Sequence, residues 1–159
     1  MDELLKLLKN NALETPENLA QMLDLPVEEV TAQIKEYEDK GVIKGYQAVV
    51  DEDRLNLDTV RAFIEVNVHP EREGGFDRIA KRISRFQAVE SVFLMSGSSD
   101  LLLMVKADNL NDVARFVSEK LATIEGVTAT STSFNLKIYK YNGILMEEED
   151  EYERLKITP

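Results

Sequence analysis

The order of hydrophobic patterns in the second half of the chain constrains the fold most. Four segments are rich in β-branched and apolar residues and are predicted to be strands: residues 60–68, 89–95, 101–105 and 128–139. Between them, apolar residues recur at helical spacing around Ile79 and again from Leu110 to Leu121. The resulting order, βαββαβ, indicates a ferredoxin-like domain in the α/β (α+β) class.

Such a domain has one face of its sheet uncovered, because both helices pack on the other face. Six apolar residues are expected to exceed the space beneath the helices: Ile64, Val66, Val105, Phe134, Leu136 and Ile138. A second copy of the chain is the simplest cover for this face. The sequence therefore predicts a homodimer through this domain and larger even-numbered assemblies.

The first fifty residues have a different pattern, that of three short helices. The first is predicted over residues 2–12, and Thr15 and Pro16 are a typical N-cap and first residue for the second. The third is predicted over residues 27–40, with Gly41 ending it. Two helices joined by a tight turn within about 26 residues form a helix-turn-helix pattern. The β-rich end of residues 41–50 adds a strand, which makes a winged helix-turn-helix domain.

Four regions follow from these patterns. Residues 1–50 form the helix-turn-helix domain and the polar residues 51–59 a hinge. Residues 60–143 form the βαββαβ domain, and residues 144–159 an acidic tail containing the charge run 147–151. We interpret this run as a solvated tail rather than a metal site, because runs of like charge are usually solvated.

Composition excludes several classes of function. The 159 residues include no Cys and one His, His69, so thiol nucleophiles and thiolate metal sites are absent and no Ser–His–acid set can be written. We therefore expect no catalytic residues, no metal and no cofactor. No apolar run approaches the roughly 18 residues of a membrane span, and the start lacks a basic secretion signal. A cytoplasmic protein that is not an enzyme is expected.

The charge distribution complicates a nucleic-acid partner. The net charge is −11, and residues 1–50 hold five Lys, no Arg and ten acidic residues. Phosphate binding depends on Lys and Arg, so the predicted DNA-binding part is itself acidic. Residues 60–143, with eleven basic and ten acidic groups, are almost neutral.

Three motifs appear in a characteristic order and spacing. Gly41-Val42-Ile43-Lys44-Gly45-Tyr46 follows the helix-turn-helix, Gly97-Ser98-Ser99-Asp100 lies between the middle strands, and Glu125-Gly126-Val127 precedes a Thr-rich strand. In these motifs the chain resembles the Lrp/AsnC (leucine-responsive/asparagine) family of transcription regulators, from the first helix to about Gly143. The resemblance implies dimers that assemble into tetramers or octamers, and an amino acid or related effector bound between dimers near the Gly-x-x-Asp turn.

Carried onto this chain, the resemblance implies an effector site at one turn and part of the last strand. Its residues are Ser96, Gly97, Ser98, Ser99 and Asp100, with Thr130 and Thr132 as weaker candidates. Backbone N–H groups at a Gly-containing turn can hold a carboxylate, and Asp100 could take an ammonium group. The alternative is structural: Gly97 permits a tight turn and Asp100 closes it.

The third helix departs from the family pattern. Pro26-Val27 stands where the family tends to have Ser-Pro, and Ala32-Gln33 where it tends to have two Arg. We expect Gln33 and Lys35 to face away from the apolar side. The candidate DNA-binding residues are Thr31, Gln33, Lys35, Lys40 and Lys44. Two hypotheses therefore stay open: a DNA-binding regulator, or a small-molecule sensor or partner-binding module whose head has lost sequence-specific DNA binding.

Overall fold

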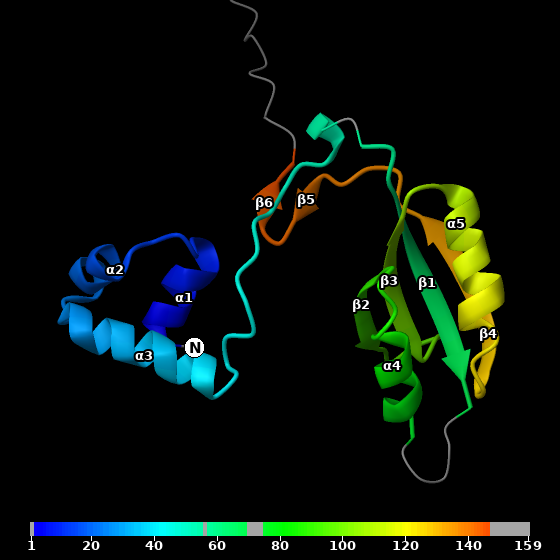
Figure 1. Ribbon diagram of the computed structural model, residues 1–159, viewed down its shortest axis with the longest axis horizontal. Helices are drawn as coiled ribbons and strands as arrows, with labels where there is room; N and C mark the ends of the chain where they lie inside the picture. The colour runs from blue at the N-terminus through cyan, green and yellow to red at the C-terminus, as the bar shows by residue number, and fades with distance from the viewer. Residues whose placement is uncertain (1, 56, 70–74, 147–159) are drawn as a thin grey trace, which may run out of the picture. The chain divides into compact units, whose positions relative to one another are not determined.

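The computed structural model describes residues 2–55, 57–69 and 75–146. Its contacts divide the chain into two compact units, Met1–Val50 and Asp51–Pro159, whose elements are labelled in Figure 1. In the described part of the chain, no helix is both long and apolar enough to cross a membrane. The predicted charge run at residues 147–151 lies outside the described residues.

The first unit contains three helices: α1 (Glu3–Asn10), α2 (Pro16–Leu23) and α3 (Val27–Asp39). The Thr15 side chain accepts a hydrogen bond from the Asn18 backbone N–H at 3.2 Å, so the predicted N-cap of α2 is confirmed. Asp24 ends α2 in the left-handed conformation, with φ of 54°, which makes the turn into α3 tight. The apolar faces of the helices meet in a small core: Leu4, Leu8, Leu19, Ala20 and Val30.

Gly41 ends α3 as predicted. Its φ of 65° is a left-handed value that favours glycine. The Val42 N–H donates to the Tyr37 carbonyl at 2.8 Å and the Gly41 N–H to the Glu38 carbonyl at 2.9 Å, the two bonds of a Schellman motif. The strand predicted to follow is wrong: residues 44–50 have no regular secondary structure, since residues 2–50 offer no second strand to pair with.

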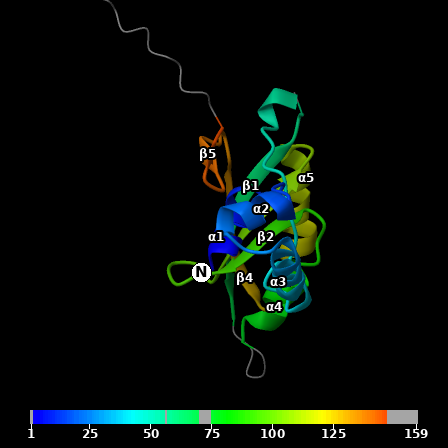
Figure 2. The ribbon, with the colours of Figure 1, turned by 90° about the vertical axis from the view of Figure 1, so that its left-hand side faces the viewer.

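The second unit has the predicted βαββαβ order. Its strands are β1 (Val60–Val68), β2 (Val89–Leu94), β3 (Leu101–Ala107) and β4 (Val127–Phe134), in the order β2-β3-β1-β4 with all neighbours antiparallel. Helix α4 (Asp77–Ile83) connects β1 to β2, and α5 (Leu110–Arg115) continues into a π-helical segment, Phe116–Leu121. Both helices lie on the same side of the sheet (Figure 2).

The strand register decides which residues face the helices. In β1 the even-numbered residues Ala62 to Val68 are buried against α4 and α5. Of the six apolar residues expected to exceed the space beneath the helices, Ile64, Val66 and Val105 belong to the core there. Phe134 pairs with Ala62 and so shares that side of the sheet. Four apolar residues on the alternate positions line the open face instead: Phe63, Phe93, Leu102 and Met104.

The last strand is shorter than predicted. It ends at Phe134, and the chain then forms a separate hairpin of β5 (Lys140–Tyr141) and β6 (Ile144–Leu145). Asn142 and Gly143, with φ of 47° and 89°, form the turn, as an Asn-Gly pair between two strands does. Leu136, which precedes this hairpin, is 95% exposed.

Candidate functional site

The outward surface of α3 is acidic. Glu28, Glu29, Glu36 and Asp39 are exposed on this helix, and Thr31 and Lys35 are exposed among them. The Thr31 hydroxyl donates to the Val27 carbonyl at 2.8 Å, within its own helix. Lys35 is therefore the basic group that α3 presents on this surface, and it forms no ion pair with any other described residue.

Gln33 lies differently from the prediction. It is half-buried, and its Nε2 donates to Asp2 Oδ2 at 3.0 Å and to the Tyr37 hydroxyl oxygen at 3.2 Å. The Tyr37 hydroxyl also donates to Asp2, and this bond lowers the pKa of Asp2 and raises the pKa of Tyr37. The expectation that Gln33 faces away from the core is wrong, since Gln33 lies one turn before Tyr37, which packs on the core.

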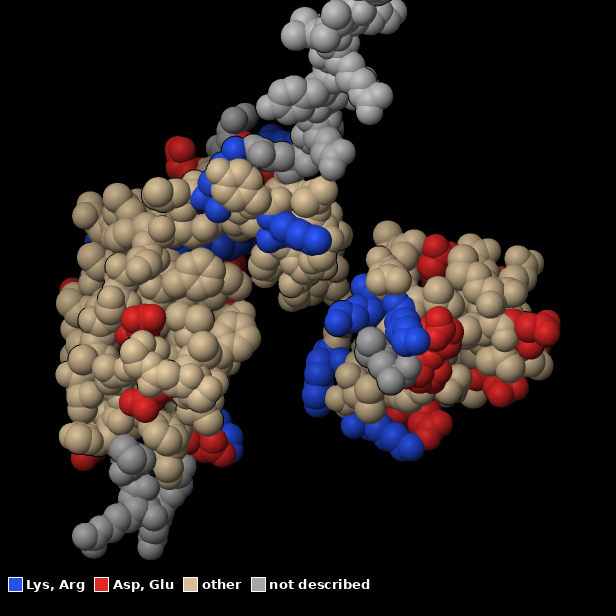
Figure 3. Space-filling model, turned by 180° about the vertical axis from the view of Figure 1, so that it is seen from behind, with Lys and Arg blue, Asp and Glu red and all other residues tan. Residues whose placement is uncertain are grey.

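The remaining candidate lysines contact the unit itself. Lys40 forms an ion pair with Glu36 one turn earlier. The Lys44 side chain folds over Gly41, since a Cβ added at Gly41 would lie 2.6 Å from the Lys44 Nζ. On the face shown in Figure 3, the basic side chains visible on this unit lie toward one side, with acidic side chains among them.

Asp100 connects the predicted effector turn to the end of β1. Its Oδ2 accepts a hydrogen bond from the Val68 N–H at 2.8 Å, and its own N–H donates to the Val66 carbonyl at 3.1 Å. Its carbonyl accepts a bond from the Met95 N–H at 2.8 Å. Asp100 therefore closes the turn, which was the structural alternative given for it, and its Oδ2 is occupied by the bond from the Val68 N–H.

The rest of the turn is open to solvent. Ser96, Gly97 and Ser98 are exposed and Ser99 is half-buried. Gly97 does not have a positive φ, and a Cβ added to it would meet no atom within 4 Å. The turn itself therefore does not require glycine at this position, in contrast to Gly41.

The sheet register brings Thr130 to the same end of the sheet as the turn. Leu101 of β3 and Thr130 of β4 both pair with Val66 of the intervening strand β1. Two strand spacings, about 9–10 Å, therefore separate their backbones. Thr132 pairs with Ile64, two residue pairs further along the sheet. Both threonines are on the edge strand, Thr130 half-buried and Thr132 exposed.

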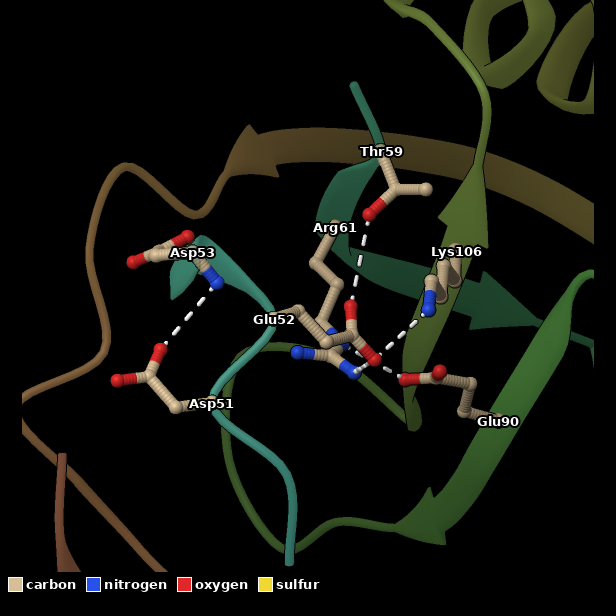
Figure 4. Close-up of polar contacts among 7 residues, drawn as sticks. All are labelled: Asp51, Glu52, Asp53, Thr59, Arg61, Glu90 and Lys106. Carbon is tan, nitrogen blue, oxygen red and sulfur yellow. Dashed lines mark hydrogen bonds and ion pairs between the residues drawn. The ribbon is translucent and has the colours of Figure 1, made fainter. Parts of the chain in front are cut away.

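Sequence reasoning missed an ionic network at the other end of the sheet (Figure 4). Glu52 Oε1 accepts hydrogen bonds from Arg61 Nη2 at 2.9 Å and from Lys106 Nζ at 2.8 Å, and Arg61 Nε contacts Glu90 Oε2 at 3.1 Å. The bond from Lys106 is the main cause that lowers the pKa of Glu52. Glu52 thus anchors the predicted hinge, residues 51–59, to β1 and β3. The partners are far apart in sequence, so no local pattern indicates them.

The described residues include no group of three or more His, Cys, Asp or Glu side chains placed to hold a metal ion.

Similar proteins match half of the chain or more in sequence. A family model described as the Lrp/AsnC ligand binding domain matches residues 61–145. YugG of Bacillus subtilis, an HTH-type transcriptional regulator, is 42% identical over 158 residues, covering 99% of this chain and 95% of the relative. The leucine-responsive regulatory protein of Rhizobium meliloti is 28% identical over 138 residues, covering 87% and 88%.

Solved structures of transcriptional regulators also resemble this chain in fold. A transcriptional regulator of Neisseria meningitidis in complex with L-Met superposes with a TM-score of 0.71 at 26% identity, covering 89% of this chain and 93% of that one. Escherichia coli AsnC has a TM-score of 0.68 at 18% identity, covering 89% and 95%, and shows the fold alone.

Proposed function

The chain belongs to the Lrp/AsnC family of HTH-type transcriptional regulators, and from that premise we propose that it binds DNA through its first unit and an amino acid through its second. The observation that supports this most directly is the tight turn at Asp24 between α2 and α3, which gives residues 16–39 the form of a helix-turn-helix. The relatives bear regulator names, and no catalytic side-chain set was predicted for this chain.

For DNA, we propose that α3 reads the sequence with Thr31 and Lys35, the exposed polar candidates on its surface. Lys40 and Lys44 supply phosphate contacts, and Gln33 positions α3 through Asp2 and Tyr37. The acidic residues around Lys35 repel phosphates, so the affinity of one unit for DNA is low. Several units in one assembly compensate through multivalency.

For the effector, we propose the turn Ser96–Asp100. Asp100 uses Oδ2 for the Val68 N–H, which leaves Oδ1 to accept a bond from an ammonium group. Exposed backbone N–H groups and serine hydroxyls of the turn hold the carboxylate. The fold of the turn leaves room for a side chain at position 97. Close approach of a ligand to the backbone is therefore the reason we propose for glycine there. Thr130 and Thr132 contribute hydroxyls from the edge strand β4 of the same sheet or of a neighbouring dimer.

For assembly, we propose that the open sheet face pairs with a second copy and that these dimers form tetramers or octamers. Phe63 and Phe93 are 38% and 51% exposed on this face, beside Leu102 and Met104. Apolar residues gathered on one face favour an interface.

Selection of bound fragments from a random DNA duplex library tests the DNA proposal. We expect an enriched sequence whose affinity falls with salt by about 0.9 log units per log unit of salt for each phosphate contacted. The double variant Thr31→Ala, Lys35→Ala should lose selective binding while its melting temperature stays unchanged. Lys6→Ala, whose ammonium already pairs with Glu3 at 2.8 Å, is the control.

Absence of any enriched duplex, together with amino-acid binding, would favour the alternative that the chain is a sensor or partner-binding module without DNA recognition. The acidic surface of α3 is the observation that keeps this second candidate open.

A further inference from the structure

A groove of about 540 Å³ lies at the end of the second unit opposite the Ser96–Asp100 turn. The connection from α4 to β2, the end of β3 and the helix after β3 form its walls. Lys106, which lines the groove, is six residues along the strand region from Asp100, or about 20 Å at a strand rise of 3.4 Å per residue. The groove is therefore separate from the proposed effector turn, and its volume is in the range of small-molecule sites.

The helix that lines this groove contains an irregular turn. Residues Phe116–Leu121 are π-helical, and the Ala122 N–H donates to the Val117 carbonyl five residues earlier at 2.8 Å. In a π turn, residues five apart lie about one turn apart, whereas in a regular α-helix they diverge. Arg115 and Lys120 are therefore brought to one side of the helix, and both line the groove. Single π turns in α-helices are frequent at functional sites.

The lining has three chemically distinct parts. Phe86 and Phe116 form an apolar wall, with their rings edge to face and centroids 5.4 Å apart. Lys120 forms no ion pair with any other described residue, and Arg115 has only a partly exposed contact with Asp112 at 3.4 Å. Asp108 and Glu119 are exposed carboxylates that also line the groove. Cations, carboxylates and an aromatic wall thus meet in one groove.

We propose that this groove is a second binding site for a free α-amino acid with an apolar side chain. Arg115 and Lys120 bind the carboxylate with charge-assisted bonds. Asp108 and Glu119 accept hydrogen bonds from the ammonium group, and the side chain packs on Phe86 and Phe116. A purely anionic ligand would meet the two carboxylates, and a purely cationic one would meet Arg115 and Lys120, so the zwitterion fits best. The proposal does not depend on DNA binding.

Equilibrium dialysis of the full chain with labelled L-leucine tests the site. We expect two leucines per chain at saturation. The variant Arg115→Gln, Lys120→Gln should bind one, with affinity at the groove reduced on the order of tenfold or more because charge-assisted bonds are lost. The control Lys81→Gln, Arg82→Gln removes two cations from α4 and should still bind two. Thermal melting of each variant verifies folding.

The analogues 3-methylbutylamine and 4-methylpentanoate lack the carboxylate and the ammonium group respectively, and neither should occupy the groove. Leucine binding that the Arg115/Lys120 variant leaves unchanged overturns the proposal, as does a wild-type chain that binds no leucine. The wild-type chain could instead bind a single leucine. If Asp100→Asn then abolishes this binding and the groove variant retains it, the groove is refuted while the proposed effector turn stands. Loss in the groove variant alone supports the groove and refutes the turn.

Discussion

Arg61 and Lys106 are directly opposite partners on the antiparallel strands β1 and β3, and one oxygen of Glu52 accepts a hydrogen bond from each. Like charges directly opposite each other destabilise a strand pair. Glu52 offsets this repulsion, and because it belongs to the segment before β1, it also fixes that segment to the sheet.

Replacement Glu52→Gln should lower the free energy of unfolding of the second unit by about 1–2 kcal/mol, since it leaves two cations facing each other at a partly exposed site. Urea unfolding at pH 7 measures this. The control Asp58→Asn removes an exposed carboxylate from the same segment and should change stability by less than about 0.5 kcal/mol. Equal effects of the two variants would contradict the role of Glu52.

The same contact makes stability depend on pH. The pKa of Glu52 in the folded protein lies below its ordinary value of 4.5, first because of Lys106 and also because of Arg61. The stabilisation is therefore complete above pH 4.5 and is lost as the pH falls through the folded pKa. The stability difference between wild type and Glu52→Gln should shrink as acid is added below pH 4.5. If this stability difference instead grew below pH 4.5, the ion pairs of Glu52 would not lower its pKa in the folded protein.

Two substitutions of Asp100 separate structure from binding. Asp100→Ala removes the acceptor of the Val68 N–H and should cost about 1–3 kcal/mol of stability. Asp100→Asn keeps a carbonyl oxygen for this bond but lacks the charge, so stability should change little. Both should weaken amino-acid binding at the turn, by about 1.5–3 kcal/mol. Calorimetry and thermal melting measure the two effects, and unchanged affinity in Asp100→Asn would place the effector elsewhere.

Two glycines provide a matched pair. Gly126 has φ of 93°, and an added Cβ would lie 2.6 Å from the Ile79 Cδ1. Gly126→Ala should therefore lower stability by about 1–3 kcal/mol. Gly97→Ala meets no atom and should leave the melting temperature unchanged while weakening effector binding. A strongly destabilised Gly97→Ala variant would show that Gly97 is required by the fold.

The open sheet face provides the test of assembly. Phe63→Glu places a charge at the centre of this face and should convert dimers into folded monomers of 18.1 kDa, because an unpaired charge in an interface is costly. Light scattering at micromolar concentration measures the mass. The control Phe93→Leu keeps the face apolar and should remain dimeric. A wild-type chain that is already monomeric would exclude the proposed pairing.

Features set by local chemistry were predictable from the sequence. The Thr15 cap and the Gly41 terminus depend on residues within one turn of themselves, and both are confirmed. The turn at Asn142 was also readable, since Asn-Gly between apolar residues is a strong hairpin signal, but the preceding apolar run was interpreted as one long strand. The strand predicted at the end of residues 41–50 does not form, because a strand exists only with a partner.

The faces of the sheet were harder to predict. In β1, Phe63 and Ile64 are adjacent and both apolar, which obscures the alternation. The polar residues Arg61, Glu65 and Asn67 all occupy odd positions, and this is the signal that identifies the open face. Contacts between distant residues, such as Gln33 with Asp2 and Glu52 with Lys106, have no local signature. The effector and DNA-binding residues therefore remain predictions.

The π turn in the helix after β3 amounts to one extra residue relative to a regular α-helix. It leaves no trace in the apolar pattern, since Val113, Val117 and Leu121 all pack on the core at the regular spacing of four. In a regular α-helix with the same residues, Arg115 and Lys120 would be five apart and about 140° from each other around the axis, so the π turn is what keeps them on one side. A homologue one residue shorter between these two positions would have its cations four apart in a regular α-helix, again on one side, so the pair can outlast the π turn itself.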